Sequence, residues 1–220
     1  MTERMSTHER IGRILAHREA DRIPVADIPW ATTLERWRRE GLPAEGDWED
    51  HLGVDKIVVI TADNSPRYPE RTLEETDRYR VYTSRWGVTL REWRHAAGTP
   101  HREAFTVQDP DSWRAAKERM TPSPDRIDWA RLKANWRRWR EQGAWINGSL
   151  WFGFEVTYSH FVGVPLFLAM VEEPEWVKEM ADTMVELSIT LMEMVWEAGY
   201  HFDGVQWWND MGYKGAQFMS

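Results

Sequence analysis

The sequence predicts an α/β protein built on a parallel sheet, and two observations carry this prediction. Residues 56–61 form an unbroken apolar and β-branched run, which is typical of a strand buried on both faces. Segments with strand and helix patterns alternate along most of the 220 residues, which is the order that gives β/α units. A composition of 42% hydrophobic residues, without an apolar run of membrane-spanning length, excludes a disordered chain and a membrane span.

The first part of the chain predicts two such units. Ser6 and Glu9 have the spacing of a capping box and begin a helix that ends near His17. We then expect a strand at 21–28, a helix from Pro29 to Gly41 and a strand at 56–61.

The later part of the sequence predicts an antiparallel β insertion followed by further β/α units. Residues 77–107 alternate aromatic and β-branched residues with polar ones, which indicates antiparallel strands. Helices are expected at 110–120, 129–143, 164–170 and 174–199, with strands at 144–148 and 202–208. The longest of these helices has an apolar stripe that includes Met180, Met184, Leu187 and Leu191.

Charge and composition restrict the classes of molecule that this protein is expected to bind. The net charge of −8 argues against nonspecific attraction to nucleic acid or to anionic membranes. The arginines at 137–140 stand among tryptophans, but Trp129, Leu132, Trp136 and Trp139 recur at helical spacing and favour a packed helix over RNA binding. The absence of cysteine excludes disulfides and thiolate zinc sites, and the opening residues do not read as a secretory signal, so we expect a cytoplasmic protein.

Polar residues that follow the predicted strands are the candidates for a site, because active sites of parallel α/β proteins lie at the carboxyl ends of strands. One such aspartate is more often a loop or helix cap than a catalyst. Two carboxylates on neighbouring strand ends, Asp63 and Asp210, would have shifted pKa values suited to proton transfer or to stabilising a cation. The substrate-binding candidates are Trp30, Asn147, Trp151, Glu155, Tyr158 and Asn209, and Asn64 also follows a predicted strand.

The histidines add no strong candidate to the predicted site. His160 lies near this group, although an ordinary hydrogen-bonded histidine is the more frequent case, and His201 precedes its strand. The histidines do not have metal-binding spacing, and we predict no metal ligand among these residues.

Four segments together resemble the uroporphyrinogen decarboxylase superfamily. They are ERIGRILAHREADRIPV, GVDKIVVITADNS, GSLWFGFEVTYSHFVGVPLFLAMVEEPEWV and AGYHFDGVQWWNDMG, at residues 9–25, 53–65, 148–177 and 198–212. The resemblance implies a partial (β/α)8 TIM barrel, comprising about the first four β/α units. It also implies a single domain over 1–220 with a β insertion at 77–107, truncated at its C-terminal end.

The resemblance also implies roles for particular residues. Asp63 matches the aspartate that, in the decarboxylases, touches the pyrrole nitrogens of the substrate and stabilises the protonated ring. Tyr158 matches a tyrosine after strand three, and Asn209 and Asp210 match the polar pair after strand four. The arginine-rich segment that binds the carboxylates of uroporphyrinogen is missing, since the first basic residue after 21–28 is Arg36, so strict specificity for that polyanion is not expected.

Three functions remain open at this stage. The first is decarboxylase-like chemistry on a small-molecule substrate, with carboxylates stabilising a cationic intermediate and with no cofactor held by this chain. The second is methyl transfer involving a corrinoid protein, with zinc ligands that would lie beyond Ser220. The third is a noncatalytic small-molecule-binding module. A homodimer is left open.

Overall fold

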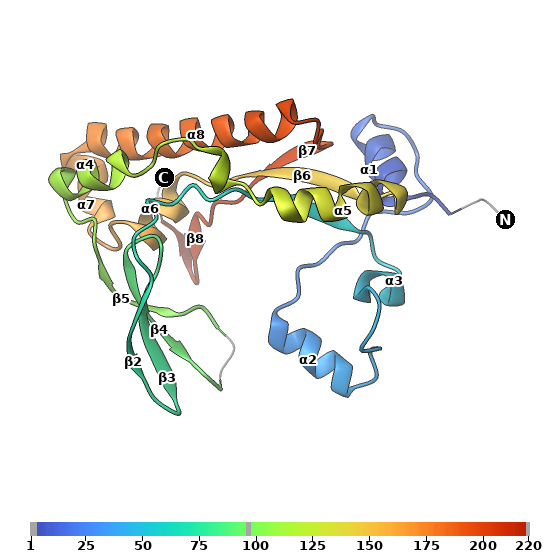
Figure 1. The fold of residues 1–220 in the computed structure, drawn as a ribbon, viewed down its shortest axis with the longest axis horizontal. Helices are drawn as coiled ribbons and strands as arrows, with labels where there is room; N and C mark the ends of the chain where they lie inside the picture. The colour runs from blue at the N-terminus through green and yellow to red at the C-terminus, as the bar shows by residue number, and fades with distance from the viewer. Residues whose placement is uncertain (1–3, 96–97, 219–220) are drawn as a thin grey trace. The chain divides into compact units, whose positions relative to one another are not determined.

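The computed structural model describes residues 4–95 and 98–218 and divides the chain into two compact units. Unit 1 comprises Met1–Ile60, Asp128–Gly148 and Gly199–Val205, and unit 2 comprises Thr61–Ile127, Ser149–Ala198 and Gln206–Ser220. Figure 1 labels the helices and strands and colours the chain from its N-terminus to its C-terminus.

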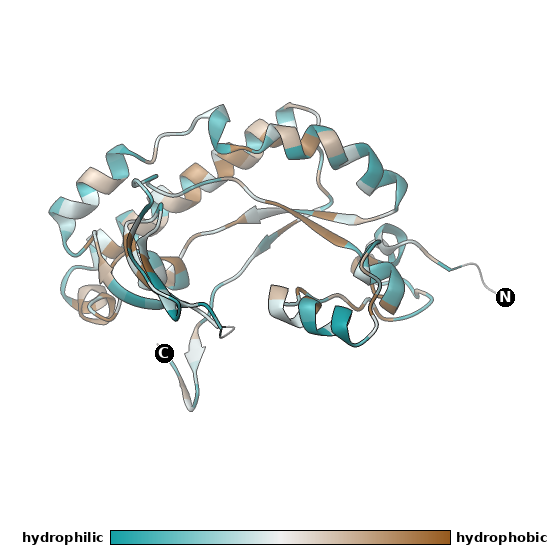
Figure 2. Cartoon of the chain, turned by 60° about the horizontal axis from the view of Figure 1, so that its bottom comes forward, coloured by the Kyte–Doolittle hydropathy of each residue, from teal (hydrophilic) through white to brown (hydrophobic). Residues whose placement is uncertain are grey.

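Unit 1 contains four helices in its described residues, and three of them were predicted with nearly these bounds. Their ranges are α1 Thr7–Leu15, α2 Ala31–Arg39, α3 Trp48–Leu52 and α5 Trp129–Glu141. The side chain of Ser6 accepts a hydrogen bond from the backbone N–H of Glu9 at 3.1 Å and caps α1, as its spacing predicts. The helix α2 is mainly hydrophilic (Figure 2).

The tryptophan stripe of α5 is confirmed as a packing surface. Leu132 and Trp139 are buried, and the Trp136 ring lies 5.3 Å from the Tyr200 ring in an edge-to-face contact. Arg140 donates to both carboxylate oxygens of Asp203 at 2.7 Å, and Arg137 pairs with Glu141. The tryptophan stripe and two of the neighbouring arginines therefore have their partners within the protein itself.

The parallel sheet has three strands in the described part of the chain, in the order β1-β6-β7. They are β1 Ile57–Ile60, β6 Trp145–Leu150 and β7 Gly204–Trp207, and β1 pairs with β6 in parallel from Ile57↔Trp145 to Ile60↔Gly148. Ile60 and Ile146 are almost fully buried, as expected for apolar strands inside a protein.

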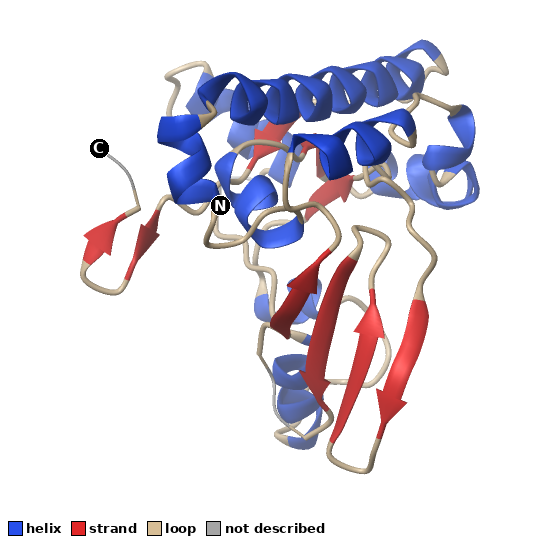
Figure 3. Ribbon diagram, turned by 90° about the vertical axis from the view of Figure 1, so that its left-hand side faces the viewer, coloured by secondary structure: helices blue, strands red, loops and turns tan. Residues whose placement is uncertain are grey.

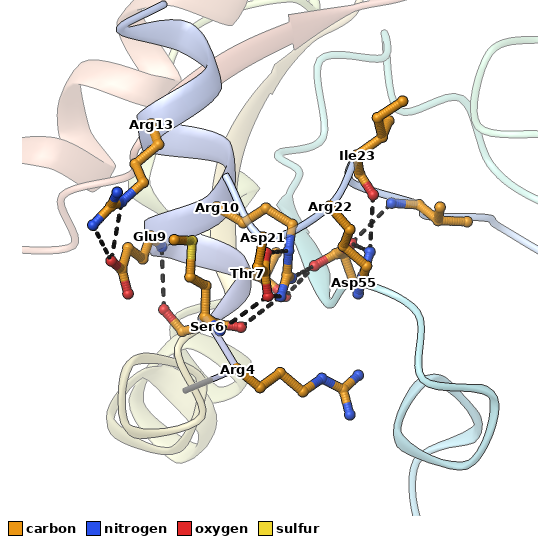
Figure 4. A network of polar contacts seen from close by, with 12 residues as sticks. Arg4, Ser6, Thr7, Glu9, Arg10, Arg13, Asp21, Arg22, Ile23 and Asp55 are labelled. Atoms are coloured by element: carbon orange, nitrogen blue, oxygen red, sulfur yellow. Dashed lines mark hydrogen bonds and ion pairs between the residues drawn. The ribbon is translucent and has the colours of Figure 1, made fainter. Parts of the chain in front are cut away.

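A buried ion-pair network holds the residues that precede β1 in sequence (Figure 4). The Asp55 carboxylate is inaccessible to solvent and accepts hydrogen bonds from Thr7, Arg10, Arg22 and the backbone N–H of Val25. Arg10 also donates to Asp21, at 2.6 Å from Nε. The network therefore ties α1, residues 21–25 and the start of β1 together.

Unit 2 contains a four-stranded antiparallel sheet in the order β2-β3-β4-β5 (Figure 3). Its strands are β2 Arg71–Glu75, β3 Tyr79–Thr83, β4 Val88–Trp93 and β5 His101–Phe105. Antiparallel strands were expected at 77–107, but the sheet begins earlier, at Arg71. A short pair, β8 Gly212–Tyr213 and β9 Ala216–Gln217, lies near the end of the described residues.

The helices of unit 2 pack around α8, Pro174–Glu197, which contacts α4 Pro110–Glu118, η1 Pro124–Arg126, α6 Phe154–His160 and α7 Leu166–Glu172. Met180, Met184, Leu187 and Leu191 of α8 are all buried, so the predicted stripe is confirmed. Residues 154–160, which lie between the strand predicted at 144–148 and the helix predicted at 164–170, form α6.

The TIM-barrel prediction is wrong. The described strands form a three-stranded parallel sheet and an antiparallel four-stranded sheet rather than a series of alternating β/α units. Four consecutive strands, β2 to β5, pair only with one another, so they contribute no parallel strand.

The strand expected at 21–28 is also absent. Pro24 has no N–H to donate, and both backbone polar groups of Val25 bind Asp55, as the N–H donates to the carboxylate at 2.8 Å and the carbonyl accepts from the Asp55 N–H at 2.6 Å. Ile23 and Ile28 are 79% and 67% exposed. The apolar residues that suggested a strand therefore lie at the surface in an extended loop.

Candidate functional site

Asp63 organises the turn that follows β1 in sequence. Its Oδ1 accepts hydrogen bonds from the backbone N–H of Ser65 at 3.1 Å and from the Ser65 hydroxyl at 2.6 Å. Its Oδ2 accepts from Nε of Arg67 at 2.8 Å. A carboxylate has about four acceptor positions. Nη1 of Arg85 also lies 3.8 Å from Oδ2 as an ion pair. At most about one acceptor position is therefore left, and it lies beside this second arginine.

The carboxylate of Asp63 is held in its ionised form. Burial by itself would raise the pKa of Asp63, but the hydrogen bonds from Ser65 and Arg67 outweigh burial, and the pKa lies below its usual value. The side chain is 18% exposed. Asp63 is thus an anion of fixed orientation, suited to stabilising a neighbouring positive charge and unsuited to donating a proton at neutral pH.

Arg67 is a site residue that the sequence did not indicate. Its backbone φ is 53°, in the left-handed region that residues other than glycine seldom occupy. Its guanidinium donates to Asp63 and, through Nη1 and Nη2, to the side chain and the carbonyl of Asp125. The strained conformation coincides with this bridge between two carboxylates.

Asn64 turns into the interior next to a small pocket. Its side chain is almost fully buried, and its Nδ2 donates to the Trp151 carbonyl at 2.5 Å and to the Ser188 hydroxyl at 2.9 Å. The pocket measures about 30 Å³, and its polar lining consists of Thr61, Asn64, Ser149 and Ser188. Typical ligand pockets measure several hundred Å³, so this pocket is far too small for a tetrapyrrole.

Asp210, Asn209 and Glu155 come together, although not as a catalytic pair. Oδ1 of Asn209 accepts from the backbone N–H of Glu155 at 2.7 Å and so caps the first turn of α6. The Asp210 side chain is exposed, and its backbone N–H donates to Oε2 of Glu155 at 3.3 Å. Among the described contacts, the partners of Asp63 and those of Asp210 have no residue in common.

Tyr158 and Trp151 belong to two different aromatic clusters. Tyr158 lies with Phe154, Phe167 and Phe218, at ring separations of 5.7 to 5.9 Å. The Trp151 ring makes an edge-to-face contact with His160 at 5.1 Å, and Trp86 stacks on His160 at 4.9 Å.

His160 is therefore a packed, neutral side chain. Burial, together with the charge of Arg102, lowers the pKa of His160 to about 4. Its contacts are with the rings of Trp86 and Trp151, which is a packing role rather than the hydrogen-bonded role expected from the sequence.

The remaining two predicted residues lie in unit 1. Oδ1 of Asn147, in β6, accepts from Nε1 of Trp145 at 2.9 Å, and a side chain at Gly204 would come within 3.0 Å of this oxygen. Trp30 is 59% exposed and precedes α2, where its carbonyl accepts from the N–H groups of Thr33 and Leu34.

Sequence reasoning missed Ser188 and Arg67. Ser188 could have been noticed as a polar residue beside Leu187 and Leu191 in the apolar stripe of α8. The sequence carried no signal for Arg67, because its role depends on a backbone conformation and on Asp125, 58 residues away.

Two features are absent from the described part of the chain. Among residues 4–95 and 98–218, no group of three or more histidine, aspartate or glutamate side chains is placed to hold a metal ion. None of the helices in the same ranges has the length and apolar character needed to cross a membrane.

No protein-family model matches this chain, and neither the curated proteins nor the solved structures include a match. The resemblance to the uroporphyrinogen decarboxylase superfamily therefore rests on the four quoted segments, and the site must be judged on its own chemistry.

Proposed function

We propose that this chain takes part in a decarboxylation, in which Asp63 is the fixed anion that stabilises positive charge on the substrate. The observation that carries the proposal is the state of the Asp63 carboxylate, which is ionised, oriented by Ser65 and Arg67, and still partly accessible. The same residue is the one that the resemblance selects. The lack of cysteine adds a cytoplasmic location to the proposal.

The chemistry follows from the charge that develops when a pyrrole acetate loses carbon dioxide. A proton adds to the ring and makes it a cation, and the bond to the carboxylate then breaks. Carbon dioxide leaves, and the electron pair of the broken bond forms an exocyclic double bond that neutralises the ring cation. A proton then adds to the exocyclic carbon to make the new methyl group, and the proton first added to the ring is released, so that one proton is taken up overall. An anion already fixed beside the ring lowers the energy of the cation without reorganising, and the acceptor position left on Asp63 suits a pyrrole N–H.

Of the two carboxylates predicted from the sequence, the contacts support a catalytic role only for Asp63. Asp210 makes a backbone contact with Glu155 and is exposed, so its contacts give no support to a pair with Asp63. The proposal therefore gives Asp63 the electrostatic role alone.

The test is carbon dioxide release by the purified protein, with uroporphyrinogen and with a single-ring pyrrole acetic acid as substrates. We expect Asp63→Asn to lower the rate by about 100-fold, because it removes the charge and keeps the shape. Asp125→Asn is the matched control, since Asp125 binds the same arginine from an exposed position, and it should retain the rate of the parent. Equal rates for the parent and Asp63→Asn, with equal melting temperatures, would overturn the proposal.

The same assay separates the alternatives. Substrate binding without turnover by the parent protein would favour the noncatalytic binding module. Transfer of a methyl group to a corrinoid, with no carbon dioxide released, would favour methyl transfer.

A further inference from the structure

The pocket beside Asn64 offers hydrogen bonds but no charge. All eight side chains that line it are uncharged, and Ala62, Leu191 and Met192 are apolar. An ion in this pocket would lose its hydration without gaining a partner of opposite charge. The lining therefore selects an uncharged ligand.

Hydrogen bonding fixes the orientation of the Asn64 amide. The Trp151 carbonyl can only accept, so the Asn64 atom 2.5 Å away from it must be the amide nitrogen. The second N–H of that nitrogen points to the Ser188 hydroxyl. The amide oxygen of Asn64 accepts from no other described residue, and the hydroxyl hydrogen of Ser188 has no acceptor among the described residues.

These two atoms make a matched acceptor and donor. Asn64 and Ser188 are each only 4% exposed, and both line the pocket. A ligand with one N–H or O–H donor and one oxygen acceptor would satisfy both of them. Two of the lining residues, Trp151 at 39% exposure and Thr61, are themselves exposed, so the pocket is bordered by residues that reach solvent.

The volume limits the size of the ligand. A water molecule needs about 10 to 15 Å³ on this measure, and an apolar cavity of about 150 Å³ accepts benzene. A pocket of about 30 Å³ therefore has room for a ligand of only a few heavy atoms. The apolar side, at Ala62, Leu191 and Met192, suits a methyl group.

We propose that this pocket binds a small neutral amide or alcohol, with its donor on Oδ1 of Asn64 and its oxygen on the Ser188 hydroxyl. This inference goes beyond the proposed decarboxylation and does not depend on it, because neither side chain belongs to the Asp63 turn contacts.

The test is a titration of the isotope-labelled protein with acetamide, followed by nuclear magnetic resonance. We expect saturable shifts of the Asn64 side-chain amide, with a Kd on the order of 1 to 10 mM for so small a ligand. Acetate, which has the same shape and a charge, should leave these signals unchanged at the same concentrations. This comparison uses the parent chain and needs no variant.

A variant tests the assigned donor. Ser188→Ala should weaken acetamide binding by about 5- to 10-fold, since it removes one hydrogen bond to the ligand. Ser159→Ala is the matched control, a buried serine on α6 outside the pocket, and it should leave the affinity unchanged. Equal shifts with acetamide and acetate, unsaturable shifts, or water as the only occupant would each overturn the inference, as would undiminished affinity in a folded Ser188→Ala protein.

Discussion

Aspartate side chains in this protein differ in role because they differ in their hydrogen-bond donors. Asp55 is enclosed by arginines and backbone, Asp63 holds a turn and keeps partial access to solvent, and Asp210 is exposed. The sequence predicted Asp63 and Asp210 as a pair on neighbouring strand ends, one stabilising charge and the other handling a proton. Their surroundings, which come from residues far along the chain, make them unequal.

The contribution of His160 to the stability of the fold can be tested by changing the pH. Its lowered pKa means that the folded state favours the neutral ring, so its contribution to stability is complete above the unfolded pKa of about 6.5 and is lost as the pH falls toward 4. Between pH 7.5 and pH 5 the free energy of unfolding should fall by about 2 kcal/mol from this group.

Urea unfolding at both pH values would measure this change. His160→Phe keeps an aromatic ring against Trp86 and cannot take up a proton, so its stability should fall less over the same range. The stability that Asp55 and Asp63 contribute through their lowered pKa values is lost only as the pH falls through the unfolded aspartate pKa of about 3.9 and below, which lies outside this pH range. The same slope in the parent and the variant would contradict this account.

At the scale of elements, α6 depends on a cap supplied from 54 residues away. Gly153, before its first residue, has φ of 98°, and a Cβ there would lie 3.3 Å from Nδ2 of Asn209. Glycine therefore meets both the backbone conformation and the close approach of the capping side chain.

We expect Asn209→Ala to destabilise the protein by about 1 kcal/mol, because the N–H of Glu155 loses its acceptor. Amide hydrogen exchange would show faster exchange in the first turn of α6 than in α4, which has its own cap at Asp109. Asn209→Asp, which retains the accepting oxygen, should restore protection, and unchanged exchange in the alanine variant would refute the capping role.

The success of the helix predictions and the failure at 21–28 have one physical reason. A helix satisfies its own backbone, so the apolar spacing in α5 and α8 was enough to predict both. A strand needs a neighbour, and the backbone of Val25 found the Asp55 side chain instead. Local pattern alone cannot distinguish these outcomes.

At the scale of the whole molecule, Asp55 ties together segments of unit 1 that are distant in sequence. It contacts α1, the loop at 21–25 and the residues before β1 (Figure 4). Asp55→Asn should lower the free energy of unfolding by about 3 kcal/mol, because Arg10, buried beside it, loses a counter-charge.

Urea unfolding followed by circular dichroism would measure the loss. Asp50→Asn is the control, since Asp50 is 71% exposed and pairs only with Lys56 among its described ion pairs, and it should have little effect. Similar unfolding midpoints for the two variants would show that the Asp55 network does not stabilise the protein.

The candidate site could be predicted only in part. Asp63, Asn64 and Trp151 were found because polar residues that follow strands are visible in the sequence. Ser188 was not found, since it meets Asn64 across 124 residues, and Arg67 was not found, since its role depends on a left-handed backbone.

The sequence by itself determined the long helices and the apolar strands β1 and β6, because each depends on composition or on contacts a few residues apart. The tertiary structure decided how the strands pair, which carboxylates are enclosed, and which polar groups line the pocket. These depend on partners separated by tens of residues. The pairing of β2 to β5 with one another, instead of with β1, gives an antiparallel sheet in place of further strands of the expected barrel.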